Sequence, residues 1–143
     1  MTTNYIIAPV PVTLVTLLWP QMSGHLQRVV DVANGEISLS SIKESLLSGK
    51  SMIMAVCKDE EIIAVVTAEK RIFESGKSAL FLPIVGGDEL DGWMPQVLEL
   101  AKLIAKDLDC SVIRGLGARS GWIRKLKNEG WTVAYTVIEQ ILE

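Results

Sequence analysis

Apolar residues recur along four stretches of the chain at intervals of three, four and seven positions, a spacing typical of helices with one buried face. These predicted helices cover residues 16–33, 41–49, about 92–108 and 119–130. Glycine lies at or just after the end of three of them, as at many helix C-termini. Ser38 or Ser40 is the expected cap of the second helix, and Asp91 is a candidate cap of the third.

Six other stretches combine β-branched and aromatic residues with short or alternating apolar runs, which indicates strands. They cover residues 5–8, 51–57, 61–68, 78–85, 110–118 and 131–142. In the last one, most apolar residues recur at every second position. Pro83 cannot donate a backbone hydrogen bond, so the fourth strand is expected to bulge or end there. This order predicts one α/β domain, 1–143, whose mixed, mostly antiparallel sheet of about six strands carries helices on both faces.

The composition is that of a globular protein, with 49% hydrophobic and 22% charged residues among 143 and a net charge of -3. A negative net charge argues against general nucleic-acid binding, because phosphate contacts need clustered Lys and Arg. The apolar stretch 5–19 is broken by prolines, lacks the basic start of a secretory signal and is shorter than the roughly 20 residues of a membrane span. We therefore expect no membrane association and no signal-directed secretion. Cys57 and Cys110 lack metal-ligand spacing and are expected as core thiols in a reducing compartment.

Patterns for metal binding or nucleophilic catalysis are weak. The single histidine, His25, has no positioned serine or cysteine partner and is expected on a helix surface. No cluster of His, Cys or acidic residues has metal-ligand spacing, so no metal site is predicted. The glycine-rich stretch 115–120 precedes a predicted helix and could hold an anion, or could let that helix pack closely on a strand.

The order and lengths of these elements resemble the Gcn5-related N-acetyltransferases (GNAT) over essentially the whole chain. The most specific parts are the long helix after the fourth strand and the terminal strand–helix–strand unit that includes Gly130-Trp131. Within that superfamily, the sequence GARSGW at 117–122 followed by RKLKNEG at 124–130 looks most like small GNAT-like proteins encoded by tailed bacteriophages.

The resemblance implies an acetyl-CoA site where the fourth and fifth strands separate, with Val85, Gly86, Gly87 and Arg119 as cofactor-binding candidates. Backbone N–H groups beside a helix N-terminus would face the pyrophosphate. The chain departs from the family pattern here, because the following residues are acidic and no Arg or Gln is present in the loop. These acids are Asp88, Glu89 and Asp91. Each carboxylate–phosphate pair at contact range costs on the order of 1 kcal/mol in water.

The catalytic positions implied by the resemblance also differ. Leu126 lies where many GNAT enzymes have a tyrosine that protonates the leaving thiolate, and leucine cannot donate a proton. Arg119 corresponds to a common asparagine, and the stretch 78–85 contains no acid to act as a general base. Glu69, at the end of the third strand, is the candidate catalytic base, although a solvated charge at a strand end explains it equally well.

Tryptophans and basic residues suggest contacts with other proteins. Trp93 and Trp122 lie near helix starts at the expected cofactor entrance, where they would plug the cleft or anchor an interface. Arg124 and Lys127 belong to a cationic helix that is either a solvated face or a docking patch. The resemblance further implies that copies of the chain associate through the last strand.

Two functions compete on this basis. Because the cofactor loop, the acid and the base all depart from the pattern, the favoured hypothesis is a catalytically degenerate scaffold, without cofactor, in a phage virion or the host cytoplasm. Its partners would be other proteins, among them phage particle components. The alternative is an acetyl-CoA-dependent N-acetyltransferase acting on an amine.

Overall fold

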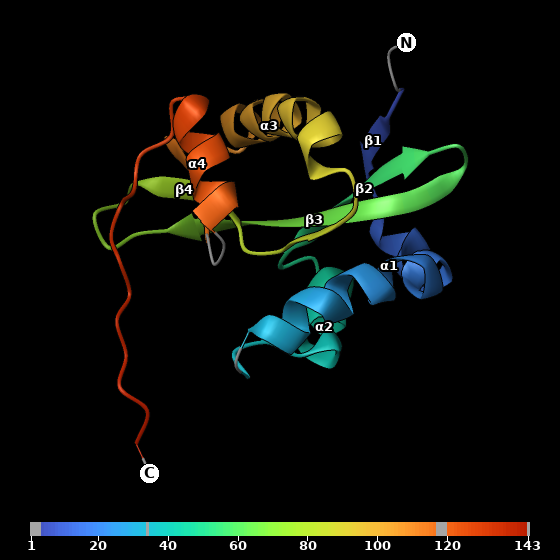
Figure 1. Ribbon diagram of the computed structural model, residues 1–143, viewed down its shortest axis with the longest axis horizontal. Helices are drawn as coiled ribbons and strands as arrows, with labels where there is room; N and C mark the ends of the chain where they lie inside the picture. Colours follow the sequence, from blue (N-terminus) through green and yellow to red (C-terminus); the bar gives the residue numbers. More distant parts are fainter. Residues whose placement is uncertain (1–3, 34, 117–119, 143) are drawn as a thin grey trace.

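The computed structural model describes residues 4–33, 35–116 and 120–142, with the backbone alone for 120–122 (Figure 1). Six strands and four helices are formed within these ranges. In chain order they are β1 (Ile6–Pro9), α1 (Val12–Val32), α2 (Leu39–Leu47), β2 (Met52–Lys58), β3 (Glu61–Ile72), β4 (Ser78–Leu82), β5 (Val85–Gly87), α3 (Leu90–Asp107), β6 (Val112–Gly115) and α4 (Ser120–Asn128).

The strands form one sheet in the order β1-β2-β3-β4-β6, and β5 pairs with β3 outside this path. All pairs are antiparallel except β4 with β6, which is parallel. The long strand β3 is central, since its first part pairs with β2 and β5 and its last part with β4. The predicted mixed, mostly antiparallel sheet is therefore confirmed.

Helices cover both faces of the sheet, as predicted. Figure 1 shows α1 and α2 on one face, and α3 and α4 on the other. One buried cluster joins the sheet to α1 and α2 through residues such as Met22, Leu46 and Val65. A second cluster joins it to α3 and α4 and contains Trp93 and Leu126. Alternate β3 residues enter opposite clusters, as the period of two in a strand requires.

The cap of α2 is one of the two residues predicted from the sequence, whereas α1 begins earlier than predicted. Ser38 caps α2, and its side chain and that of Ser41 each accept a hydrogen bond from the other's backbone N–H. Helix α1 begins at Val12, earlier than the predicted position 16, directly after Pro11. Pro20 therefore lies inside α1 and not in its first turn. The early start follows from Pro11, whose fixed φ suits a helix entry and whose carbonyl accepts a hydrogen bond from Leu14 N–H.

The prediction of a strand over 131–142 is wrong for this structure. These residues have no regular secondary structure, and all except Trp131 are exposed. Figure 1 shows the segment leaving the body of the protein toward the C-terminus. Alternating apolar residues indicate a chain that can form a strand, but a strand also needs a neighbour for its backbone groups, and this segment has none among the described residues.

The neighbours Leu46 and Leu47 give a matched test of the α1–α2 core. The Leu46 side chain is 1% exposed and Leu47 is 44% exposed, although both belong to α2. Leu46→Ala should lower the free energy of unfolding by about 2–5 kcal/mol, because it removes buried methyl groups and leaves a cavity. Leu47→Ala should cost less than about 1 kcal/mol. Urea denaturation measures both; equal losses would contradict this packing.

Two glycines test the contact between β5 and α1. A Cβ on Gly86 would lie 2.5 Å from the His25 carbonyl oxygen, whereas a Cβ on Gly24, within α1, would meet nothing within 4 Å. Gly86→Ala should therefore destabilise the protein by about 1–3 kcal/mol, because α1 must move away. Gly24→Ala should stabilise it by about 0.5–1 kcal/mol through helix propensity. A thermal melt in which both variants change in the same direction would argue against this close approach.

Candidate functional site

A gap in strand pairing lies beside Pro83. Strand β4 pairs in parallel with β6 from Ala79–Val112 to Leu82–Gly115, and the pairing ends there. After Pro83 and Ile84 the chain resumes as β5, which pairs with β3 and not with β6. The predicted break at Pro83 is therefore confirmed. Because β5 and β6 do not pair with each other, the sheet opens at the end of β5 that leads into α3.

The glycines expected to bind a cofactor belong to β5 and pack closely. Gly86 contacts α1, and a Cβ on Gly87 would lie 2.4 Å from Ala64 Cα, with φ at +134°. The N–H of Asp88 is also occupied, since it donates to the Ile63 carbonyl. Strand packing therefore accounts for both glycines without a ligand, and cofactor binding by Val85, Gly86 and Gly87 stays a prediction.

Helix α3 begins without a side-chain cap. Glu89 occupies the N-cap position in the left-handed conformation, with φ at 57°, and makes no capping hydrogen bond. The expectation that Asp91 caps the helix is wrong, because Asp91 already lies in the first turn. A helix start carries the positive end of the helix dipole. In this one the Gly92 N–H donates to the Glu89 carbonyl, and no side chain caps the first turn. This end of α3 is therefore suited to an anion.

The three acids at this helix start are each paired with a cation from another element. Arg28 Nη1 of α1 lies 3.1 Å from Asp88 Oδ1, and Lys58 Nζ of β2 lies 2.7 Å from Glu89 Oε1. The Tyr5 hydroxyl also donates to Glu89 Oε1 at 3.1 Å. The third pair joins α4 to α3. The six charged residues, called the α3-start cluster below, are Arg28–Asp88, Lys58–Glu89 and Lys125–Asp91.

This pairing corrects the expected repulsion. The sequence places three acids where a pyrophosphate would lie, and the fold brings three cations to the same place, so the cluster carries no net charge. Exposed ion pairs contribute little, typically about 0–1 kcal/mol, so a phosphate can compete with each carboxylate for its cation.

The protonation of the cluster follows from its hydrogen bonds. Arg28 donates to Asp88 and lowers the pKa of that carboxyl. Lys58 lowers the pKa of Glu89 in the same way, and the Glu89 hydrogen bond raises the pKa of Lys58. Loss of hydration, ahead of its hydrogen bond to Glu89, raises the pKa of Tyr5. At neutral pH Asp88, Glu89 and Lys58 are therefore charged, and Tyr5 is a neutral hydrogen-bond donor.

A row of polar residues follows one face of β3 next to the break. Thr67 pairs with Ile53, which belongs to the α1–α2 cluster, so Thr67 lies on that face of the sheet, and Glu69 and Arg71 follow at two-residue steps. Glu69 is directly opposite Phe81 of β4, and Arg71 donates to Glu69 Oε1 at 2.8 Å. The predicted base is thus half-buried and oriented by a cation.

Thr67 is the functional candidate that sequence reasoning missed. Its side chain is 2% exposed, and Oγ1 has no hydrogen-bond partner among the described residues. Its backbone N–H donates to the Ile84 carbonyl at 2.9 Å, which places the residue beside the break after Pro83. A threonine within a run of Val and Ala in a strand is an ordinary sequence feature, so no local signal distinguishes it.

A hollow of about 210 Å³ reaches Glu69 from the opposite end of α3. The β2–β3 ladder ends at Met52–Ala68, and beyond it Glu69 and Lys70 line the hollow together with the loop before β2 and Leu108. Its lining combines the basic residues Lys50 and Lys70 with apolar residues such as Met52 and Leu80. A small substrate can reach Glu69 through this hollow. The α3-start cluster lies at the other end of α3.

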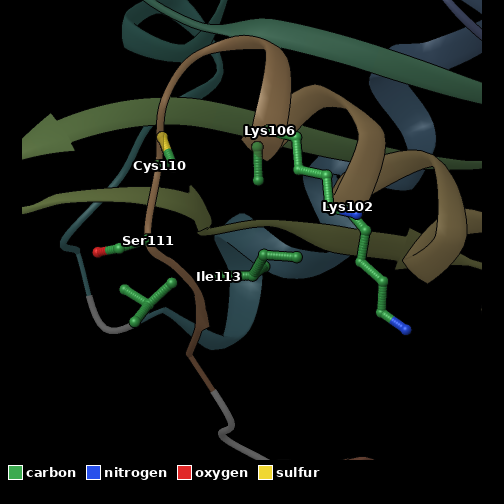
Figure 2. A pocket seen from close by; sticks show the side chains of 7 residues that line it. Lys102, Lys106, Cys110, Ser111 and Ile113 are labelled. Atoms are coloured by element: carbon green, nitrogen blue, oxygen red, sulfur yellow. The ribbon is translucent and has the colours of Figure 1, made fainter.

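A second, shallow hollow of about 170 Å³ lies between the end of α3 and β6. Figure 2 shows Lys102 and Lys106 from α3 beside Cys110, Ser111 and Ile113. It lies away from the start of α3 and contains no group that the cofactor chemistry requires. Within the described residues no cluster of His, Cys, Asp or Glu could hold a metal ion. Among the described helices, none is long and apolar enough to cross a membrane.

The remaining residues that the sequence analysis proposed for a functional site do not gather at one place in the described structure. Trp93 is 1% exposed, and its Nε1 donates to the Asp88 carbonyl at 2.7 Å, so the expectation that it anchors a partner is wrong. Trp93 lies on the buried face of α3, so its ring belongs to the core. Arg124 and Lys127 are exposed on α4. Arg119 and the side chain of Trp122 lie outside the described residues.

His25 and Leu126 also acquire roles from their surroundings. His25 Nε2 lies 2.9 Å from the Ile62 carbonyl oxygen, so this residue joins α1 to β3 and does not project freely from the helix surface. Leu126 is buried in the core formed by α3 and α4. Hydrophobic packing therefore accounts for a leucine where the resemblance implies a tyrosine.

No family model and no curated protein matches the sequence. Solved structures match over nearly the whole chain. An aminoglycoside acetyltransferase from an uncultured soil metagenomic sample superposes with a TM-score of 0.72 at 13% identity, covering 98% of this chain and 99% of its own. The ribosomal-protein-alanine N-acetyltransferase from Brucella melitensis biovar Abortus 2308 gives 0.67 at 11% identity, with the same coverage. At these identities the similarity concerns architecture, and the chain has the GNAT fold.

Proposed function

We propose that this protein binds acetyl-CoA and transfers its acetyl group to an amine. The observation that carries the proposal is the near full-length correspondence with acetyltransferase structures, combined with a sheet that opens at Pro83 beside an uncapped helix start. One of the similar proteins is named an N-acetyltransferase, so nitrogen is the acceptor class proposed for this chain.

The α3-start cluster supports binding of the cofactor's pyrophosphate. The start of α3 has no side-chain cap and carries the positive end of the helix dipole, and Arg28, Lys58 and Lys125 are present within the cluster. A bound pyrophosphate would replace the carboxylates as the partner of these cations. The three acids then weaken binding of the cofactor because they compete with its pyrophosphate for these cations, but they do not prevent binding.

Thr67 supports a ligand group at the break in the strand. A buried hydroxyl without a partner costs about 1–3 kcal/mol, because it has lost its hydrogen bonds to water. A carbonyl or amine held beside Ile84 would restore that hydrogen bond. Thr67 is thus suited to position a reacting group by donating from Oγ1.

The chemistry needs a proton acceptor near the same face. Acetyl-CoA would supply an acetyl group activated as a thioester. In the transfer, the amine nitrogen would bond to the acetyl carbon and the bond from that carbon to sulphur would break, so that CoA leaves as its thiolate. The amine would lose one proton to a base. Glu69 lies two residues after Thr67 in β3, on the same face of the sheet. Its carboxylate is the group proposed to accept that proton. Arg71 orients it.

The hypothesis of a degenerate phage scaffold receives less support. Pairing of the three acids removes its electrostatic argument, although buried Leu126 still provides no proton to a leaving thiolate. The similar solved structures named above are acetyltransferases, which favours the enzymatic alternative at the level of the fold.

The α3-start cluster predicts opposite effects for its acids and cations on CoA binding. Asp88→Asn should tighten binding about fivefold, because it removes competition for Arg28, and a like-charge contact is worth on the order of 1 kcal/mol. Arg28→Met should weaken binding by a similar factor. Titration calorimetry with CoA measures both.

The control for this titration is Glu99→Gln. It removes an acid that pairs with Lys102 on the exposed face of α3, and it should leave CoA affinity unchanged. Absence of binding by the wild-type protein and by Asp88→Asn at millimolar CoA would contradict the proposed function.

Thr67 predicts a separation of stability from activity. Thr67→Val keeps the shape and removes the unpaired hydroxyl, so the free energy of unfolding should rise by about 1 kcal/mol. The rate of acetyl transfer should nevertheless fall about tenfold, and Thr67→Ser should restore it. Release of CoA thiol, followed with an amine that the wild-type protein acetylates, measures the rate. Equal kcat/KM for the wild type and Thr67→Val would exclude a role in positioning.

A further inference from the structure

Two arginines lie over aromatic rings on the sheet face that also carries the proposed base. Arg71 Cζ lies 3.9 Å from the centre of the Phe81 ring. Arg114 Cζ lies 4.8 Å from the centre of the Phe73 ring and 5.6 Å from that of Tyr135. A guanidinium group that lies over a ring keeps the N–H groups at its edge available for hydrogen bonds in its own plane. Both arginines are therefore oriented by the protein before any ligand binds.

The strand register brings these arginines to Glu69. Glu69 of β3 lies opposite Phe81 of β4, and Phe81 lies opposite Arg114 of β6, so the three residues form one row across the sheet. Neighbouring strands are about 4.8 Å apart, so the backbones at Glu69 and Arg114 are about 10 Å apart. Arg71 follows Glu69 by two residues on the same face and donates to its Oε1. The residues Glu69, Arg71, Phe81 and Arg114 are called the arginine cluster below.

The arginine cluster lies beside the helices of its face and is open to a ligand. Helix α1 packs against β3 and β5, and α2 against β2. Figure 1 shows both helices below β2 and β3, with β4 to their left. The Phe81 side chain is 4% exposed and forms the floor of the cluster, whereas the Arg71 side chain above it is 49% exposed. The Glu69 side chain is 15% exposed. A small molecule on this floor would therefore meet both a carboxylate and a guanidinium.

The charges around Glu69 are mainly positive. Arg71 pairs with Glu69 at 2.8 Å, whereas Arg114 makes no ion pair with any residue that the structure describes. The hollow that reaches Glu69 adds Lys50 and Lys70 to its surroundings. A ligand with several positive charges would be repelled here, and a ligand with a negative group would be attracted.

We propose that the acceptor of the acetyl group is a small amine that also carries a carboxylate, and that the arginine cluster binds this carboxylate; this inference rests on the proposed function. The carboxylate accepts hydrogen bonds from the edges of Arg114 and Arg71, a pairing for which the guanidinium fork is suited. The amine at the other end of the molecule lies toward Glu69, the group proposed to accept its proton. The two charged ends of such an acceptor thus meet groups of opposite charge.

The size of the acceptor follows from the access to Glu69. The hollow that reaches this residue measures about 210 Å³, and sites for drug-sized ligands are larger, about 300–1,000 Å³. Amino carboxylates with one to three carbons between the two groups are therefore the probes for this site.

The first experiment measures binding without catalysis. The Nε–Hε signals of Arg71 and Arg114 in ¹⁵N-labelled full-length protein are assigned by their loss in Arg71→Lys and Arg114→Lys. Glycine, β-alanine and 4-aminobutyrate are then titrated against the wild-type protein, each beside its own carboxamide. The Arg114 signal should shift with at least one amino carboxylate, and its carboxamide should bind about tenfold more weakly, because it offers no charged acceptor. An Arg114 signal that does not move, or equal affinity for acid and amide, overturns the proposal.

The second experiment measures acceptor choice in acetyl transfer, through release of CoA thiol. The preferred amino carboxylate should have a kcat/KM about tenfold above its carboxamide, and Arg114→Gln should abolish this preference through KM. Arg124→Gln, the same substitution on exposed α4, should leave the preference unchanged. Spermidine, a polycation, should be a poor acceptor.

Failure of this proposal differs from failure of the proposed function. If CoA binds and the carboxamides or spermidine are acetylated as well as the amino carboxylates, acetyl transfer stands and the acceptor class is wrong. If calorimetry detects no CoA binding, the proposed function is wrong and the acceptor role is overturned with it.

Discussion

The missing N–H of Pro83 is the constraint on which the site depends. An unbroken strand over 78–87 could pair with β3 on one side and β6 on the other along its whole length. Proline cannot continue that ladder, so the chain divides into β4, which keeps both neighbours, and β5, which keeps β3 alone. The division directs the chain into the start of α3 and leaves Thr67 opposite the break with an unsatisfied hydroxyl.

Electrostatics at the start of α3 is a balance among elements distant in sequence. Asp88, Glu89 and Asp91 are adjacent in the chain, but their partners come from α1, β2 and α4. The pairs tie the two helical layers and the sheet to one helix end. They also give that end a set of cations whose present partners are exposed carboxylates. A ligand anion would therefore exchange one set of ion pairs for another, and would not have to overcome a net negative charge.

The edge of the sheet and the C-terminal segment show a different kind of incompleteness. Strand β6 is four residues long, and six large apolar residues beyond α4 are exposed to water. At the opposite edge of the sheet, β1 ends in Pro9, which lacks a backbone donor for a further strand.

The sequence by itself determined the elements whose causes are local. Helical periodicity located α1 to α4 to within a few residues, and serine chemistry narrowed the α2 cap to Ser38 or Ser40. Pro83 marked the break, because proline lacks an N–H in any surroundings. Only the tertiary structure decided the roles that depend on neighbours in space. Trp93 became a core residue, the glycines of β5 became packing contacts, and three acids acquired cations. The segment 131–142 is the sharpest case: alternation shows that it can pair, but pairing requires an edge that no local pattern specifies.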